Sequence, residues 1–142
     1  GSNGGLLVGA AMTRKPDLFR AVVCQVPLLD MMRYHKLLAG HSWMGEYGDP
    51  EGEEREAILS YSPYQNIKKA VAYPRAFFVT STKDDRVHPG HARKMVARLR
   101  ELGNDPLYYE NIEGGHGGAA DLEQRARRTS LEYSYLYRSL ID

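Results

Sequence analysis

Three short apolar runs, each followed by a loop and a helical segment, constrain the fold more than any other feature of this sequence. The runs cover residues 21–26, 76–81 and 107–112, and β-branched or aromatic residues recur in them. Strands that are mostly apolar and alternate with helices are typical of a parallel sheet covered on both faces. We therefore predict an α/β fold with about three parallel strands and flanking helices.

The spacing of apolar residues predicts the helices around these strands. The segment 3–14 is apolar nearly all round, which indicates a buried helix. Two further helices are expected over residues 89–102 and 120–140, and weaker patterns favour helices over residues 30–38 and 50–59. Pro50 would then lie in the first turn of its helix, and residues 40–50 are expected to be irregular.

The length of 142 residues allows one domain, and we expect residues 1–142 to be only part of it. Three strands make a thin sheet for a fold of this class. No apolar strand precedes the turn at Gly1, and the first helix has no evident partner for half of its apolar surface. The missing strands are therefore expected before Gly1. A Gly-Ser pair left by a cloning vector is the alternative explanation of the first two residues.

Composition and charge exclude several classes of function. The chain has 19 Lys and Arg residues against 18 Asp and Glu residues, so its net charge of +1 gives no field that favours nucleic acid or an anionic membrane. No apolar run approaches the roughly 20 residues needed to cross a bilayer, and we expect a soluble protein, either cytoplasmic or periplasmic. Cys24 is the only cysteine, which excludes an internal disulfide framework and a multi-cysteine zinc site.

Three further patterns have structural explanations that we favour. His88 and His91 are spaced like a metal-binding pair, but no third ligand is evident, so we expect no metal and no cofactor. The basic run 125–128 is expected to form the solvated face of the last helix and not a nucleic-acid patch. Tyr133 and Tyr137, one helical turn apart, are expected to contribute to packing.

Three polar side chains lie where the carboxyl edge of the sheet is expected. Ser2 precedes the first helix, Asp84 or Asp85 follows the second strand, and His116 follows the third. Open α/β sheets bind ligands at this edge, and the order Ser, Asp, His is that of the α/β-hydrolases. Each residue alone has a structural explanation, such as a helix cap or a turn. Together, in this order and at these positions, they predict a catalytic triad.

The chemistry of such a triad assigns a role to each side chain. Ser2 would be the nucleophile, His116 the general base, and Asp84 the carboxylate that orients the imidazole. The backbone amide of Asn3 would donate a hydrogen bond to the oxyanion of the intermediate. Glycines 4 and 5 would supply the small residues that a sharp strand-to-helix turn requires.

The segments that carry these residues resemble the prolyl oligopeptidase family of serine peptidases, and the resemblance covers essentially the whole chain. It rests on the Gly-Ser-Asn-Gly-Gly turn and on five other stretches: residues 21–36, 40–48 with its Trp-Met-Gly-Glu-Tyr sequence, 61–67 (Tyr-Ser-Pro-Tyr-Gln-Asn-Ile), 83–87 (Lys-Asp-Asp-Arg-Val) and 114–117 (Gly-Gly-His-Gly). The resemblance implies that Ser2, Asp84 and His116 form the triad. It also implies that residues 1–142 are a partial catalytic domain, without the upstream strands and the β-propeller of the family.

The same resemblance implies a substrate pocket and an activity. Trp43 and Tyr47 would line the pocket, Leu28 would be an apolar wall residue, and the indole would stack on a substrate proline ring. Arg86 would donate a hydrogen bond to a carbonyl of the substrate backbone. The implied function is that of a serine endopeptidase that hydrolyses short peptides after proline and needs no cofactor.

Two alternatives stay open at this point. The chain could come from an oligopeptidase or a dipeptidyl peptidase of the same family with another specificity. It could also be a catalytically silent fragment that folds by self-association, or by pairing with the missing N-terminal part, because an exposed sheet edge and an unmatched apolar helix need a partner. The family's second oxyanion donor is a tyrosine upstream of the serine and does not occur in this chain.

Overall fold

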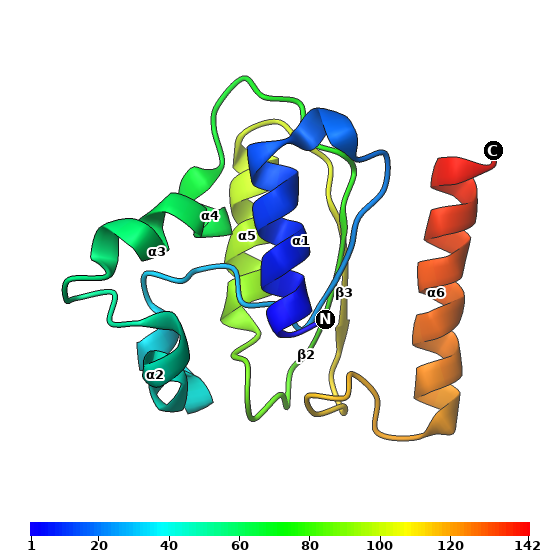
Figure 1. The fold of residues 1–142 in the computed structure, drawn as a ribbon. Helices are drawn as coiled ribbons and strands as arrows, with labels where there is room; N and C mark the ends of the chain where they lie inside the picture. Colours follow the sequence, from blue (N-terminus) through cyan, green and yellow to red (C-terminus); the bar gives the residue numbers. More distant parts are fainter.

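A computed structural model describes residues 1–142, and a parallel three-stranded sheet forms its centre (Figure 1). The strands have the same order in the sheet as in the chain and are β1 (Val23–Gln25), β2 (Phe77–Ser81) and β3 (Leu107–Asn111). In the register of the sheet, Phe77 lies between Val23 and Leu107. The predicted α/β fold with three parallel strands is confirmed.

Three long helices cover the two faces of the sheet. Figure 1 shows α1 (Asn3–Arg14) and α5 (Gly90–Glu101) on one side of the strands and α6 (Leu122–Leu140) on the other. Alternate residues of β2 serve the two faces, as expected for a strand. Phe78 packs in a core with residues of α1 and α5, whereas Phe77 packs with Tyr135 of α6. The helices predicted over 3–14, 89–102 and 120–140 are confirmed to within two residues at each end.

The connections contain several shorter elements. They are the helices α2 (Met44–Tyr47), α3 (Arg55–Tyr61) and α4 (Pro63–Asn66), and 3₁₀ turns at Pro16–Leu18, Tyr34–Lys36 and Leu38–Trp43. The predicted helix over 30–38 is wrong, because this segment forms turns and Leu38 has a positive φ of 48° that no α-helix continues through. The helix predicted over 50–59 begins only at Arg55, so Pro50 precedes it. The irregular stretch 40–50 contains α2.

Two expectations about packing also need correction. Only one face of α1 is buried, and Leu7 on the opposite face is 69% exposed. Tyr133 and Tyr137 of α6 are 69% and 57% exposed, so they do not pack within this chain. The reason is geometric: Tyr135 faces the sheet, and residues two positions away on a helix point to roughly the opposite side. No helix of the structure has both the length and the hydropathy that crossing a bilayer requires.

Candidate active site

Ser2 lies in a sharp turn between the edge of the sheet and the start of α1. Its backbone angles, φ 52° and ψ −118°, fall in a region that residues other than glycine rarely adopt. The turn is held because the Ser2 N–H donates to the carbonyl of Gln25 at 2.9 Å and the Ser2 carbonyl accepts from the Gly5 N–H at 2.9 Å. The hydroxyl does not cap α1. A strained serine at the start of a helix is similar to the nucleophile elbow of α/β-hydrolases.

The two glycines after this turn differ in how much space surrounds them. A Cβ on Gly5 would lie 2.6 Å from the Cβ of Pro27, so any side chain there would push the loop after β1 away from α1. A Cβ on Gly4 would meet no atom within 4 Å. The predicted need for a small residue therefore applies to Gly5, and no contact in the structure explains Gly4.

Asp84 follows β2 and its side chain is completely buried. Its Oδ1 atom accepts hydrogen bonds from the backbone N–H groups of Arg86 and Val87, both at 2.9 Å. These bonds fix the orientation of the carboxylate without using up its second oxygen. Asp85, the alternative, is exposed and makes no comparable contact.

His116, from the loop after β3, meets the Asp84 carboxylate. Its Nδ1 atom lies 2.9 Å from Oδ2 and 3.1 Å from Oδ1 of Asp84. An ionised carboxylate only accepts hydrogen bonds, so Nδ1 carries the proton and the neutral ring presents the Nε2 lone pair. No hydrogen bond joins His116 to the Ser2 hydroxyl; the polar contacts of the ring are those with Asp84. The structure thus brings the predicted acid and base together, with the predicted nucleophile at the edge of the same sheet.

Asn111, at the end of β3, organises the loop that carries His116. Its Oδ1 atom accepts from the N–H groups of residues 113 and 114, and its Nδ2 group donates to the Gly118 carbonyl at 3.2 Å and to Gln124 at 2.7 Å. Gly118 has a φ of 77°, a conformation that favours glycine. A side chain on Gly114 would lie 2.8 Å from the Ala119 nitrogen. The glycines around His116 therefore permit a tight loop.

A chain of polar contacts on α6 connects this histidine loop with the strand beside Ser2. Arg128 donates to the carbonyl of Gly117 at 2.6 Å and forms an ion pair with Glu132 at 3.4 Å. Glu132 accepts from the Gln25 side chain at 2.6 Å, and the carbonyl of Gln25 binds the N–H of Ser2. The Arg128 side chain is only 17% exposed. The prediction that residues 125–128 form a solvated helix face is therefore confirmed for Arg125 and Arg127, which are exposed, and is wrong for Arg128.

The predicted substrate-binding residues line one small cavity of about 110 Å³. Its lining consists of Ser2, Asn3, Leu28, Trp43, Glu46, Tyr47 and Arg86. The Tyr47 hydroxyl donates to the side-chain oxygen of Asn3 at 2.8 Å. Burial raises the pKa of Tyr47, and nearby Glu46 raises it further, so the phenol stays a donor at neutral pH. All four side chains predicted to bind substrate therefore surround the hydroxyl-bearing turn.

Sequence reasoning missed four residues that shape the site. Glu46 lines the cavity, and Asn111, Gln124 and Arg128 hold the histidine loop. The sequence did contain a signal for Asn111, since an asparagine at a strand end followed by Glu-Gly-Gly is typical of a side-chain-stabilised turn. Gln124 and Arg128 carry no such signal, because helix surface residues of these types are usually solvated.

Known proteins match this chain along its whole length. The model of the prolyl oligopeptidase family, peptidase S9, matches residues 1–141. An uncharacterised peptidase of Sinorhizobium fredii is 57% identical over 143 residues, which cover all of this chain and 20% of that protein. A prolyl endopeptidase of Elizabethkingia meningoseptica is 41% identical over 128 residues, covering 87% of this chain and 18% of the relative.

Solved structures show the same arrangement of strands and helices. A post-proline cleaving enzyme from Rickettsia typhi superposes with a TM-score of 0.95 at 41% sequence identity, over 99% of this chain and 20% of that one. A structure from a study of two prolyl endopeptidases superposes with a TM-score of 0.92 at 44% identity, over 98% of this chain and 21% of that one. The chain spans about a fifth of the length of these relatives. From the first residue of the serine turn to the end of α6, it belongs to the prolyl oligopeptidase family of peptidases.

Proposed function

We propose that residues 1–142 form part of the catalytic domain of a serine peptidase that hydrolyses short peptides after proline through Ser2, Asp84 and His116. The observation that carries this proposal is the contact of the His116 Nδ1 atom with the buried Asp84 carboxylate at 2.9 Å. Structural ion pairs alone do not require a strained serine at the same edge of the sheet, which this chain also has. The names of the relatives, prolyl endopeptidase among them, support the substrate class.

The mechanism follows from the roles of these groups. The Ser2 oxygen attacks the scissile carbonyl carbon while its proton passes to Nε2 of His116. The peptide oxygen becomes an oxyanion, to which the backbone N–H of Asn3 donates; this N–H starts α1 and has no partner within the helix. The C–N bond then breaks and His116 protonates the leaving amine. Water, deprotonated by His116, hydrolyses the acyl-serine and restores the enzyme.

Specificity for proline rests on the cavity beside Ser2. A proline side chain is a rigid apolar ring, and the indole of Trp43 offers a flat apolar surface that suits it. Leu28 and Tyr47 close the cavity, and Arg86 supplies the donors for a backbone carbonyl of the substrate. A cavity of about 110 Å³ suits a compact ring better than a long side chain.

Labelling with a fluorophosphonate probe tests the triad, because the probe reacts with an activated serine. We expect modification of Ser2, and none in the Ser2→Ala or His116→Ala variant. A folded chain whose Ser2 resists the probe would contradict the proposal. Rates of hydrolysis after proline, arginine and alanine in the longest available polypeptide test the specificity. Preference for arginine would favour another oligopeptidase of the family, and removal of N-terminal dipeptides would favour a dipeptidyl peptidase.

A second candidate is supported by an apolar surface on the far side of the sheet. Tyr133, Leu136, Tyr137, Leu140 and Ile141 of α6 together line an almost wholly apolar hollow. A further hollow of about 390 Å³ lies between α6 and the edge of β1. As the alternative to an active isolated chain, we propose that this surface pairs with a second copy of the chain or with the preceding segment of a longer polypeptide, and that Ser2 stays unreactive until it does. A chain that light scattering shows to be a stable monomer, and whose Ser2 reacts with the fluorophosphonate probe, would contradict this.

A further inference from the structure

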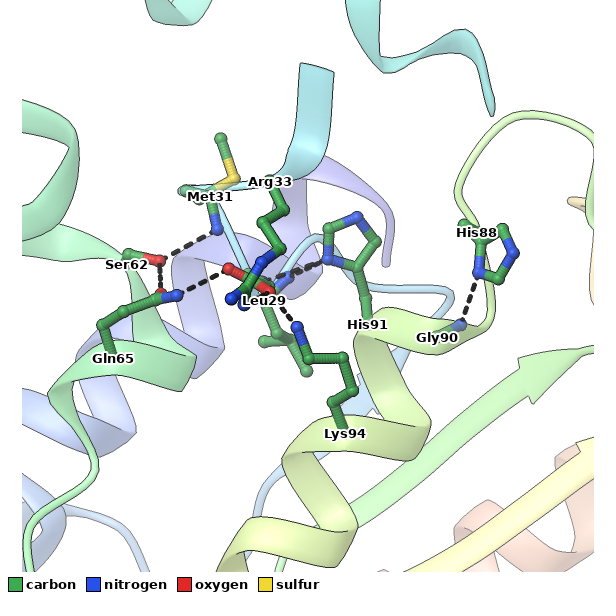
Figure 2. A network of polar contacts seen from close by, with 10 residues as sticks. Leu29, Met31, Arg33, Ser62, Gln65, His88, Gly90, His91 and Lys94 are labelled. Atoms are coloured by element: carbon green, nitrogen blue, oxygen red, sulfur yellow. Dashed lines mark hydrogen bonds and ion pairs between the residues drawn. The ribbon is translucent and has the colours of Figure 1, made fainter. Parts of the chain in front are cut away.

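The loop after β1, residues 26–31, is held by a buried polar network that lies apart from the triad. Figure 2 shows the side chains that converge on it from α4 and α5. His91 of α5 is only 2% exposed, and its Nδ1 atom accepts hydrogen bonds from the backbone N–H groups of Leu29, at 3.2 Å, and Asp30, at 3.0 Å. Leu28, the next residue back along the chain, lines the cavity beside Ser2.

The next backbone N–H of the same loop is also bound by a side chain. The Ser62 hydroxyl accepts from the N–H of Met31 at 2.9 Å and itself donates to the side-chain oxygen of Gln65 (Figure 2). Three consecutive N–H groups, at residues 29–31, therefore find acceptors on side chains of other elements. Because a buried N–H without an acceptor is costly, the loop conformation depends on these two side chains.

The Asp30 side chain completes the network. Its carboxylate is fully buried and is bound by Lys94, by Arg33 at 3.2 Å and by Gln65 at 2.6 Å (Figure 2). The ammonium group of Lys94 also lies 4.5 Å from the centre of the Tyr64 ring. A buried carboxylate with cationic and amide partners anchors the loop to α4 and α5, which belong to the packed core.

The chemistry of His91 fixes its protonation state. A ring nitrogen that accepts from two N–H groups cannot carry a proton, so His91 is neutral with its proton on Nε2. The charged or titratable groups that face it are Asp30 from the loop, Lys94 from α5 and His88 from the turn before α5. Burial lowers the pKa of His91 to about 4 and outweighs the opposite influence of Asp30.

We propose that His91 is a positioning residue for the substrate pocket: as a neutral acceptor it holds residues 29–31, and through them Leu28, in the place that shapes the cavity beside Ser2. The role of the cavity rests on the proposed peptidase function, whereas the anchoring of the loop does not. Protonation of the imidazole would remove the acceptor and release the loop, so the shape of the pocket is coupled to the charge of a side chain that never touches substrate.

A matched pair of variants tests the proposal. His91→Asn keeps an oxygen acceptor close to the position of Nδ1, whereas His91→Leu removes it and fills similar space. We expect amide hydrogen exchange of Leu29 and Asp30, followed by NMR, to accelerate at least about tenfold in His91→Leu and to stay within about threefold of the parent in His91→Asn. Equal exchange in both variants would overturn the proposal.

A measurement on the unmodified chain covers the case in which His91→Leu fails to fold. The ring nitrogen shifts of His91 should show the proton on Nε2 from pH 8 down to about pH 5, and Leu29 and Asp30 amide shifts should move together with the ring when it titrates. A proton on Nδ1, or a charged ring at pH 7, would overturn the proposal.

Kinetics of proline peptides in the longest available polypeptide connect the loop to the pocket. We expect His91→Leu to raise KM about tenfold while kcat changes less, and His91→Asn to restore KM. A kcat that falls with KM unchanged would contradict a role in the pocket. If neither variant nor parent hydrolyses peptides but the exchange difference persists, the proposed peptidase function fails and the anchoring of the loop stands.

Discussion

The two helices that follow β2 and β3 bury very different shares of their residues, although both are amphipathic. α5 buries five of its 12 residues, whereas α6 buries only Tyr135 of its 19. Figure 1 shows α5 against the strands and behind α1, and α6 alone on the far side of the sheet. The side of the sheet covered by α1 and α5 is the packed half of the molecule, and Ser2 and Asp84 of the proposed triad belong to it. His116 belongs to a loop tied to α6, on the sparsely packed half. The sparsely packed half therefore holds the member of the triad that is most easily displaced.

The largest expected effect breaks the contact between the Asp84 carboxylate and the His116 ring, which joins the two halves at the proposed site. Asp84→Asn keeps the shape of the side chain but no longer favours the imidazole tautomer that presents Nε2 to Ser2. Replacing the corresponding carboxylate costs about 10⁴-fold in turnover in a Ser-His-Asp enzyme, and we expect a similar fall in the rate at which Ser2 is labelled. Asp85→Asn is the matched control and should label at the parent rate. Equal rates in the two variants would remove Asp84 from the site.

The next effect tests the tight packing between α1 and the loop after β1. Gly5→Val places a side chain where a Cβ already lies 2.6 Å from Pro27, so we expect a loss of about 3 kcal/mol in the free energy of unfolding. Gly4→Ala, one residue earlier and in open space, should change stability by less than about 1 kcal/mol. Urea unfolding followed by circular dichroism measures both. Similar losses for the two variants would mean that this junction is not tightly packed.

As the pH falls, the free energy of unfolding should decrease first through protonation of His91 in the packed half, and only at lower pH through protonation of carboxylates. The pKa of His91 is about 4 in the folded chain against 6.5 when free, so the unfolded state binds the proton first and stability falls as pH drops from about 6.5 to about 4. A difference of this size is worth about 3 kcal/mol in total. Asp30 and Glu110 have lowered pKa values, so their stabilisation is lost at lower pH, below 3.8 for Asp30 and from 4.5 to about 2 for Glu110.

Unfolding free energies measured at half-unit intervals from pH 7 to pH 4.5 test this expectation. The parent chain should lose stability steadily over this range, and His91→Asn, which cannot be protonated, should show a much flatter dependence. A parent curve that is flat over the same range would show that His91 is not buried in its neutral form.

The main elements of both halves could be predicted from the sequence, because the spacing of apolar residues along each segment matches the face that the strand or helix buries in the core. The segment 30–38 could not, since its conformation depends on side chains that lie far away in the chain, such as His91 and Ser62. The exposure of Tyr133 and Tyr137 could not be predicted from the sequence either. One-turn spacing shows that two residues share a helix face, but not which face meets the sheet.

The same limit applied to the site. Ser2, Asp84 and His116 could be predicted as a triad because their order and their positions at the expected strand ends are visible in the sequence, and the predicted pocket residues followed from resemblance. The residues that hold the histidine loop were missed, since Arg128 acquires its role only when α6 docks beside β1, where Glu132 contacts both Arg128 and Gln25. Positions predicted to carry chemistry thus leave a local signal, whereas the supporting positions, with the exception of Asn111, do not.

The smallest expected effect concerns the link between α6 and the histidine loop. Arg128→Ala removes the donor to the Gly117 carbonyl and the ion pair with Glu132, while Arg127→Ala removes an exposed charge of the same type from the same helix. Because a hydrogen bond from a charged donor contributes about 1.5–3 kcal/mol but only the loop depends on it, we expect Ser2 labelling to slow about tenfold in Arg128→Ala with a change of less than about 1 kcal/mol in global stability. Arg127→Ala should match the parent in both measurements. If Arg128→Ala instead labels normally, the loop is held without Arg128, through Asn111, Gln124 and the contact of His116 with Asp84.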